Sequence, residues 1–463
     1  MRSKLATKRE PETIDTVMDY VGSDIISYTE NYLEDMKVVN HSTMIPLYFS
    51  STGAHIVNLL NVACAKDGGS FCPFYGGSTC GRHGFESQKE HFLEKFGQVP
   101  DTRVHLMHVA PAGYSKDTFM QFFTDEKYGF LNWGPNDPII PNHLIVRTTE
   151  AGYTGSIVEP TSEEKKNGRQ YKIQEGLAKK YCAGILAIPE FYSITMEGKM
   201  DYSSQMENAL LEILDKGRMN KNMARGEIDY YSYHTLWAGT QPGKRFDVSS
   251  GLGRRLNFYY YMPSKEDTEA YLEAQKKGYD KRVEPTVLNN IRNYIYALWS
   301  VRFISKIAFT KEYIDFRDTL PIIRHTDLSL ADNLAIGYNY MTAFSEASSV
   351  ISVGIDERLK KLLLTLAESR RMVSMDNKVE WLMFREYLKD KPVYFYEIVQ
   401  KINEKQLLTM EDAARKLNEA VKQGIFGSFT WEDERRNTKK LILYDPRIFS
   451  NAKEALESWE KEH

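Results

Sequence analysis

The chain has 463 residues, of which 42% are hydrophobic and 27% are charged, a balance that excludes collagen-like, low-complexity and intrinsically disordered proteins. Its 60 Lys and Arg against 63 Asp and Glu leave a net charge of -3, so no overall positive field attracts nucleic acid or anionic lipid. Four cysteines are too few for a secreted disulfide scaffold of this length, and the apolar stretches fall far short of a membrane span of roughly 18 residues. We therefore expect a folded cytoplasmic protein of several domains with no membrane partner.

Residues 10–65 are predicted to be helical, because apolar side chains recur there at intervals of three and four. The following stretch, 66–85, is rich in Gly, Ser and Cys and is predicted to be a loop. Three cysteines and one histidine in and beside it match the composition of a structural zinc site, namely Cys64, Cys72, Cys80 and His83. Their seven-residue gaps are wider than those of the usual zinc knuckle, so a buried free thiol at Cys64 and a disulfide between Cys72 and Cys80 stay open as alternatives.

From residue 104 the chain is predicted to be α/β, with a parallel sheet and helices on both faces. Short apolar runs alternate there with helical segments, as they do in such folds. The runs are VHLMHVA (104–110), AGILAIP (183–189), HTLWAGT (234–240) and LNFYYYM (256–262).

The C-terminal part of the chain, from about residue 358, is predicted to be helical and then to end in a hairpin. Helix candidates at 381–387, 394–402 and 410–423 precede the strand candidates IFGSFTW and TKKLILY. Three helices followed by a β-hairpin are typical of a winged helix, which binds DNA or docks a protein partner. We expect three parts: a helical region at 1–90, the α/β core with a helical lid at 91–350, and a linker helix with a winged-helix domain at 351–463.

The first sheet run leads into a segment that has the length of the phosphate loop G-x-x-x-x-G-K-[ST]. In that loop, backbone N–H groups and a helix N-terminus hold phosphate, and the lysine contacts the terminal phosphates. The segment consists of Ala110, Pro111, Ala112, Gly113, Tyr114, Ser115, Lys116, Asp117 and Thr118. Ala110 and Ser115 replace the two fingerprint glycines, and Asp117 replaces the metal-binding hydroxyl, so an ordinary strand-turn-helix junction is the alternative.

Further segments follow this loop in the order found in the MCM replicative helicases, so that residues 104–335 resemble the AAA+ module of that family. The matching segments are 149–154, 175–178, 184–191, 206–214, 215–221, 236–242, 245–257 and 321–332. The resemblance implies a P-loop ATPase that binds ATP and Mg²⁺ between the subunits of a ring, expected to be a hexamer. Its function would be to translocate on or remodel DNA as a helicase-like motor, in DNA replication of a mobile element, because the N-terminal OB-fold collar of the replicative enzymes is missing.

The resemblance also assigns catalytic roles. Glu190 would polarise the attacking water, and Gln241 would stand at the sensor-1 position. Arg255, or its neighbour Arg254, would reach the γ-phosphate held by an adjacent subunit, and Arg324 would be the sensor-2 arginine.

One departure from the family pattern concerns the metal. Pro189 stands where the family has the aspartate that orients the magnesium shell. We hypothesise that Asp117 returns the lost carboxylate to the same Mg²⁺ from the loop. The competing interpretation is an inactive AAA+ scaffold that acts as a DNA-binding initiator or partition protein, or a AAA+ machine that remodels protein complexes.

Two local groups of cations are candidates for DNA contact, because backbone binding requires positive charge and reach. The first group lies in the expected pre-sensor hairpin and contains Lys216, Arg218, Lys221 and Arg225. The second lies in the expected wing and contains Arg435, Arg436, Lys439 and Lys440. The alternatives are a solvated loop for the first group and a protein-docking surface for the second.

Overall fold

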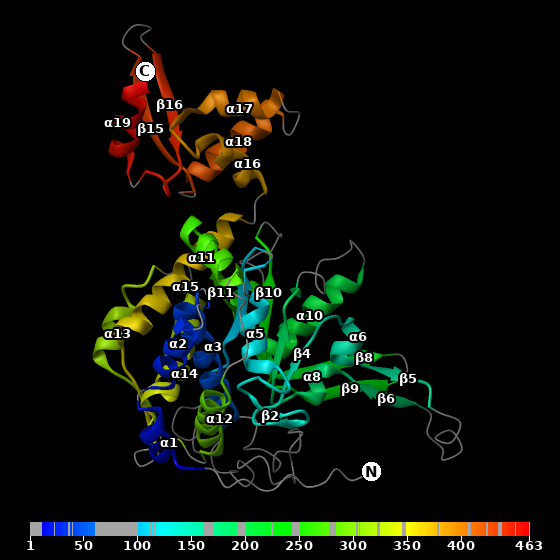
Figure 1. The fold of residues 1–463 in the computed structure, drawn as a ribbon. Coiled ribbons are helices and arrows are strands. Elements are labelled where there is room, and N and C mark those ends of the chain that lie inside the picture. Colours follow the sequence, from blue (N-terminus) through cyan, green and yellow to red (C-terminus); the bar gives the residue numbers. More distant parts are fainter. Residues whose placement is uncertain are drawn as a thin grey trace. The chain divides into compact units, whose positions relative to one another are not determined.

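In the computed structural model the chain divides into two compact units, residues 1–242 with 248–370 and residues 243–247 with 371–463. Each unit is described by itself (Figure 1). The structure describes residues 12–22, 24–35, 38, 40–60, 101–111, 113–114, 116–160, 171–191, 201–223, 226–242, 251–276, 284–301, 304, 306–321, 325–344, 349–376, 379–404, 409–422, 425–433, 438–449 and 451–462.

A five-stranded parallel sheet lies at the centre of the first unit, and it confirms the predicted α/β class. Its strands in chain order are β1 (His105–Val109), β4 (Asn142–Leu144), β7 (Ile185–Ile188), β10 (Thr235–Thr240) and β11 (Leu256–Tyr260). Their order in space is β11-β1-β10-β7-β4, and every neighbouring pair is parallel. The four predicted runs form strands β1, β7, β10 and β11. All residues of the first three strands are buried, as expected for largely apolar runs that are covered on both faces of a sheet. The short, partly polar strand β4 was not predicted.

Helix α3 (His41–Asn58) lies against the sheet, and nearly all of its residues are buried. Ser51 Oγ donates to the carbonyl oxygen of Val104 at 2.7 Å and accepts a hydrogen bond from Trp237 Nε1 at 2.8 Å. The ring of His55 lies 3.0 Å from Thr235 Oγ1. The helices in residues 10–65 were therefore predicted correctly, but they do not form a region of their own. They belong to the same core as the sheet.

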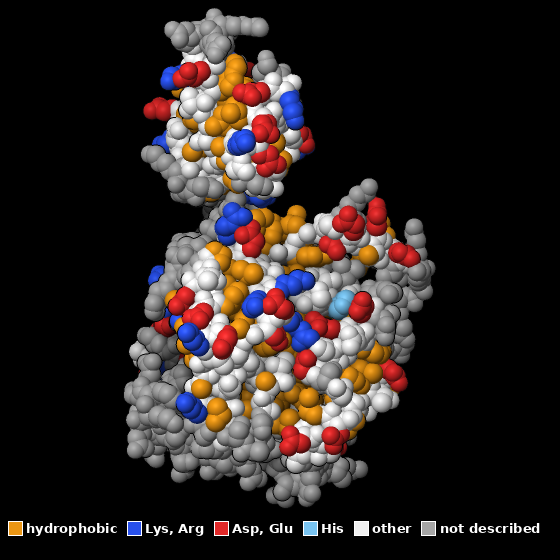
Figure 2. All heavy atoms as spheres, turned by 90° about the vertical axis from the view of Figure 1, so that its left-hand side faces the viewer, with side chains coloured by type: hydrophobic (Ala, Val, Ile, Leu, Met, Phe, Trp, Pro, Cys, Tyr) orange, Lys and Arg blue, Asp and Glu red, His pale blue; other side chains and the backbone are white. Residues whose placement is uncertain are grey.

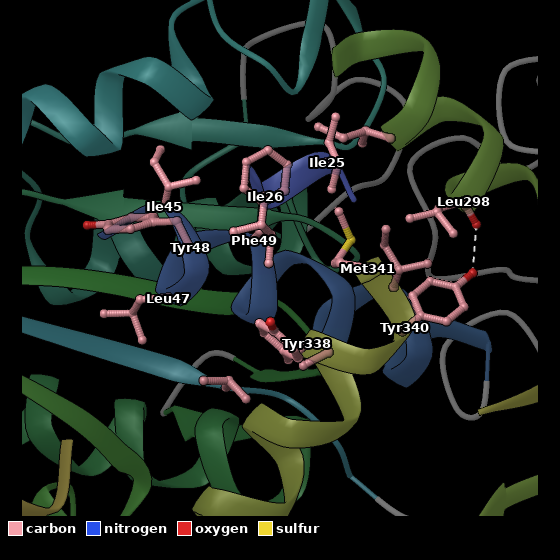
Figure 3. Close-up of a cluster of buried hydrophobic side chains, with 14 of the residues drawn as sticks. Ile25, Ile26, Ile45, Leu47, Tyr48, Phe49, Leu298, Tyr338, Tyr340 and Met341 are labelled. Carbon is pink, nitrogen blue, oxygen red and sulfur yellow. Dashed lines mark hydrogen bonds between the residues drawn. The ribbon is translucent and has the colours of Figure 1, made fainter. Parts of the chain in front are cut away.

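Helix α14 (His325–Ala343) packs along α3 at two glycines. A Cβ atom on Gly337 would clash with the carbonyl oxygen of Ser50 and would lie 2.6 Å from the backbone nitrogen of Ala54. Figure 3 shows the apolar surroundings of this contact, in which Tyr340 donates its hydroxyl to the carbonyl oxygen of Leu298 at 2.8 Å. The two helices can approach so closely because neither Gly53 nor Gly337 carries a side chain.

We expect Gly337→Ala to destabilise the protein. The added methyl group meets backbone atoms that cannot rotate away, which costs about 3 kcal/mol, and the better helix propensity of alanine returns about 1 kcal/mol. The free energy of unfolding, measured by urea denaturation, should fall by about 2 kcal/mol. The control is Gly354→Ala, where the nearest atom to the new Cβ is Asn339 Oδ1 at 3.8 Å. Equal stability of the two variants would contradict the close helix contact.

Several smaller elements surround this core. Three two-stranded antiparallel pairs are β2 with β3, β5 with β6 and β8 with β9, and β12 pairs in parallel with β13. The remaining described elements of this part of the chain are α1 (Ile14–Val21), α2 (Ile25–Asp35), α5 (Lys116–Thr124), β2 (Asn132–Gly134), β3 (Asp137–Pro138), α6 (Glu150–Thr154), β5 (Gly155–Val158), β6 (Lys172–Glu175), α8 (Leu177–Lys180), α10 (Asp201–Lys216), β8 (Arg218–Met223), β9 (Gly226–Tyr231), η3 (Gly253–Arg255), α11 (Lys265–Lys276), α12 (Pro285–Ser300), β12 (Lys306–Phe309), α13 (Lys311–Arg317), β13 (Val350–Val353) and α15 (Glu357–Asp376).

The second unit contains the three helices and the hairpin that the sequence predicts. These are α16 (Val379–Leu388), α17 (Phe395–Glu404), α18 (Met410–Lys422), β15 (Gly427–Asp433) and β16 (Thr438–Tyr444). A short strand, β14 (Val393–Tyr394), and a final helix, α19 (Ala452–Glu462), were not predicted. The strands form an antiparallel sheet in the order β14-β16-β15, and the apolar faces of the helices enclose a separate core.

The boundaries of the units differ from the predicted ones at 90 and 350. Helices α1, α2 and α3 share the core of the sheet, so the described residues up to 60 and those from 101 onward belong to one unit, and this first unit extends into α15, to residue 370. Among the helices that the structure describes, none combines the length and the apolar character needed to cross a bilayer.

Candidate functional site

The candidate site lies at the carboxyl ends of three adjacent strands, β1, β10 and β7. Ligands of parallel α/β sheets bind outside this edge. Numbered along the chain, the strands stand in the order 5-1-4-3-2, which differs from the orders of dinucleotide-binding and flavodoxin-like sheets. The fourth strand, β10, lies between the first and the third, so residues that follow all three strands emerge next to one another.

Lys116 and Glu190, two of the predicted site residues, are in contact across this edge. Nζ of Lys116 lies 3.0 Å from Oε1 of Glu190 and 3.8 Å from Oδ1 of Asp117. The lysine side chain is only 5% exposed, whereas those of Glu190 and Asp117 are 49% and 51% exposed. The lysine side chain is therefore almost completely enclosed by protein, and the two carboxylates beside it are partly exposed to solvent.

The described residues of the turn before Lys116 include one in a left-handed conformation. Gly113 has a φ of 86°, in the left-handed region that favours glycine, and Tyr114 N donates to the carbonyl oxygen of Pro111 at 3.4 Å. Helix α5 begins at Lys116, so its first backbone N–H groups have no partners within the helix and point toward the turn. Ala110 N donates to the carbonyl oxygen of Thr240 at 3.1 Å, which anchors the start of the turn to β10.

Burial and charge perturb two groups at this site. Partial burial raises the pKa of Asp117. The positive charge of Lys116 opposes this increase, and the negative charge of Glu190 adds a smaller increase of its own. Complete burial, together with the positive charge of Lys116, lowers the pKa of His108 on β1 to about 3. His108 is 1% exposed, and among the described residues neither of its ring nitrogens has a hydrogen-bond partner, so the imidazole is buried and neutral. His108 is not among the site residues predicted from the sequence.

The predicted catalytic residues divide into two groups. Gln241 directly follows β10, at the same edge as Lys116 and Glu190. Arg254 and Arg255 precede β11 and therefore lie at the opposite edge of the sheet, one strand length of about 15 Å from the loop. Arg255 forms an ion pair with Asp215 at 2.6 Å, and Arg254 is exposed. Neither arginine belongs to the site of its own chain.

Strands β8 and β9 form a hairpin in the segment where a pre-sensor hairpin was expected, and its described cations are paired with acids. Arg218 makes two hydrogen bonds with Asp229 across the hairpin, one of them 2.8 Å long. Lys221 Nζ lies 2.8 Å from both carboxylate oxygens of Glu150 on α6. Arg218 and Lys221 are thus each neutralised by an acid, on the opposite strand and on α6 respectively. On the face that Figure 2 shows, which is the left-hand side of Figure 1, cations and acids are also mixed.

The described cations of the expected wing also contact other side chains. Lys439 forms an ion pair with Glu432 at 2.5 Å. Lys440 Nζ lies 5.5 Å from the centre of the Trp431 ring and 5.7 Å from that of Tyr394, within the range of cation–π contacts.

Aromatic side chains gather beside the loop, and the sequence analysis did not single them out. Tyr114 contacts Tyr261, which follows β11, and Tyr271 on α11. The only signal for them in the sequence was the tyrosine-rich run LNFYYYM, which the strand prediction fully accounted for.

Several predicted residues lie outside the described part of the chain. They are Ala112, Ser115, Arg225, Arg324, Arg435, Arg436, the four residues Cys64, Cys72, Cys80 and His83 of the zinc prediction, and the side chain of Lys216. In the described ranges no group of three His, Cys, Asp or Glu side chains is arranged to hold a metal ion. Comparison with protein-family models and with curated proteins finds no match for this chain.

Proposed function

We propose that the protein is a P-loop ATPase of the AAA+ type, related to the MCM helicases, that binds ATP at the turn 110–118. The contact between Lys116 and Glu190 carries this proposal. The two residues are 74 positions apart, and each was assigned to the site from a different sequence segment. A cation that faces a phosphate and a carboxylate that activates water must share one site, and the strand order brings them together.

The side chains at this edge fit a magnesium ion together with nucleotide phosphates. Mg²⁺ is usually held by one or two carboxylates and by phosphate oxygens, and Asp117 and Glu190 offer two half-exposed carboxylates beside Lys116. The ion would neutralise phosphate charge. Asp117 is the residue that would hold it in place of the aspartate missing at Pro189. Lys116 would pair with the phosphates, which frees Glu190 to orient water.

The position of Arg255 supports a ring in which neighbouring subunits share each site. Arg255 lies at the edge of the sheet opposite Lys116, so it serves only a nucleotide bound by another copy. Closed cyclic assembly provides such contacts. In this proposal the ion pair with Asp215 keeps the arginine extended in position until the neighbour binds ATP.

We expect Arg255→Ala to retain ATP binding and to abolish turnover, because an arginine donated by a neighbour stabilises charge that develops only in the transition state. Phosphate release by mixtures of variant and wild-type subunits should fall more steeply than the fraction of wild type. Asp215→Asn, which removes the ion-pair partner but keeps the arginine, should lower turnover less than Arg255→Ala does. Activity strictly proportional to the wild-type fraction would argue against a shared site.

The proposed substrate of the motor is DNA. The order α16, β14, α17, α18, β15, β16 supports a winged helix in the second unit, and the paired hairpins β5–β6 and β8–β9 support two projections beside the sheet. The second candidate function is remodelling of protein complexes. It is favoured by the ion pairs of Arg218 and Lys221, which reduce the charge available for phosphate contacts.

Phosphate release measured with and without single-stranded DNA, over a range of salt concentrations, tests the choice. Stimulation that falls with salt supports the DNA motor. ATP turnover without any salt-sensitive DNA affinity supports the protein-remodelling function. Tight duplex binding that is indifferent to nucleotide would support the non-hydrolysing initiator instead.

A further inference from the structure

Four tyrosine rings from three segments meet beside the loop. The centre of the Tyr114 ring lies 5.8 Å from that of Tyr271, with 37° between the planes, and 6.5 Å from that of Tyr261, with 66° between the planes. Tyr259 stacks on Tyr261 at 6.4 Å with an angle of 12°. The loop, the end of β11 and helix α11 therefore share one aromatic cluster, and Figure 1 shows α11 next to β11.

Helix α11 is held in a defined position beside the loop. The hydroxyl groups of Tyr114 and Thr268 are 3.2 Å apart. Ser264 and Asp267 cap the start of the helix reciprocally, since Ser264 N donates to Asp267 Oδ2 at 2.9 Å and Asp267 N donates to Ser264 Oγ at 3.0 Å. Because this cap lies a few residues after β11, it fixes where α11 begins, and the helix in turn positions Tyr271.

The rings differ from ordinary core residues in their exposure. Tyr114, Tyr261 and Tyr271 are all half-buried, and the neighbouring Met262 is 55% exposed. Tyr114 and Tyr271 also lie outside the hydrophobic core that surrounds the sheet. Part of each of these three side chains therefore reaches solvent next to the turn that is proposed to hold phosphates.

We infer that Tyr114, Tyr261 and Tyr271 form the nucleobase-binding surface of the site and recognise a purine nucleoside triphosphate by stacking. This inference rests on the proposed function, because the loop must hold the phosphates. Stacking on aromatic side chains needs only the π-face of a base, so it does not distinguish adenine from guanine, and the larger face of a purine stacks more strongly than that of a pyrimidine. The polar side chains of the cluster, Thr268 and Asp267, already make hydrogen bonds within the protein. The site therefore accepts ATP and GTP alike.

The experiment compares the binding of four probes, Mg-ATP, Mg-GTP, Mg-CTP and magnesium tripolyphosphate, to the full chain by calorimetry. The wild type should bind ATP and GTP with affinities within about threefold of each other, CTP more weakly, and tripolyphosphate about tenfold more weakly than ATP. Tyr271→Leu should weaken ATP and GTP binding about tenfold and leave tripolyphosphate binding unchanged. Tyr271→Phe, which keeps the ring, should match the wild type, and thermal melting of both variants checks their folding.

The possible outcomes separate this inference from the proposed function. Tripolyphosphate that binds as tightly as ATP, or ATP binding that does not change in Tyr271→Leu, overturns the stacking surface and leaves the phosphate site standing. A strong preference of the wild type for ATP over GTP overturns recognition by stacking alone. Failure of both ATP and tripolyphosphate to bind overturns the proposed function itself, and the inference falls with it.

Discussion

Lys116→Met should weaken the binding of Mg-ATP at least about 100-fold, because it removes charge-assisted hydrogen bonds to phosphate that are worth about 3 kcal/mol together. Methionine retains the apolar volume of the buried lysine stem, so the packing around α5 should survive. Glu190 loses its partner without penalty from burial, since its side chain is 49% exposed. Calorimetric titration of the full chain with Mg-ATP measures the change.

The matched control for this substitution is Lys311→Met. Lys311 begins α13 and is exposed, so the same change of side chain there should leave ATP binding unaltered. Thermal melting of both variants separates loss of the site from loss of the fold. If Lys116→Met binds ATP as the wild type does, the turn 110–118 is a structural junction and the proposed ATPase function is refuted.

The second large effect should be a loss of stability in mild acid, caused by three buried neutral histidines. Burial holds the pKa of His105 and His234 well below the ordinary value of 6.5, and it lowers the pKa of His108 to about 3. Two of them are acceptors: His105 Nδ1 accepts from Leu236 N at 3.0 Å, and His234 lies 2.6 Å from the hydroxyl of Tyr153. A proton cannot be added to these acceptors without breaking the hydrogen bonds.

The sign follows from proton uptake. Below pH 6.5 the unfolded chain binds protons at these histidines and the native chain does not, so the free energy of unfolding is intact above pH 6.5 and falls as the pH decreases. Each histidine contributes about 1.4 kcal/mol per pH unit. Glu30 opposes them, because burial raises its pKa to about 7 and the native state therefore gains a proton first. Three histidines lower the free energy of unfolding and one glutamate raises it, so the free energy of unfolding should fall by about 3 kcal/mol per pH unit between pH 6.5 and 5.

Urea denaturation of the full chain at pH 7.5, 6.5 and 5.5, followed through the buried residues Trp237 and Trp299, measures this loss. His108→Phe should reduce the slope by about 1.4 kcal/mol per pH unit. It should also raise the stability at pH 7.5 by about 1 kcal/mol, since both ring nitrogens of His108 are buried without partners. A slope that is the same in the variant and the wild type would show that His108 titrates normally in the folded protein.

Local sequence pattern was sufficient for most elements of this protein. The runs at 104–110, 183–189, 234–240 and 256–262 are largely apolar because strands buried on both faces have few positions that face water. The three helices and the hairpin of the second unit were predictable for the same kind of reason, since each buries one face with a regular period. Strand β4 has only three residues, too few to show any period.

The candidate site was predictable only in part. The resemblance to the MCM family assigned Lys116 and Glu190 to one site, and the sheet brings them together because the carboxyl ends of parallel strands meet at one edge. The aromatic cluster was not predictable, since Tyr114 and Tyr271 come together only when α11 lies beside the loop.

The amino-acid sequence alone determined the four main strands of the sheet and the three helices and hairpin of the second unit, because hydrophobic pattern and periodicity are local properties of the chain. Tertiary structure decided where α3 lies, since its hydrogen bond between Ser51 and Trp237 joins residues 186 positions apart. The tertiary structure also decided which cations are paired with acids. Arg218 contacts Asp229 because of the register of β8 and β9, and Lys221 contacts Glu150, which is 71 positions away. Neither partner could be deduced from the sequence, because tertiary packing selects it.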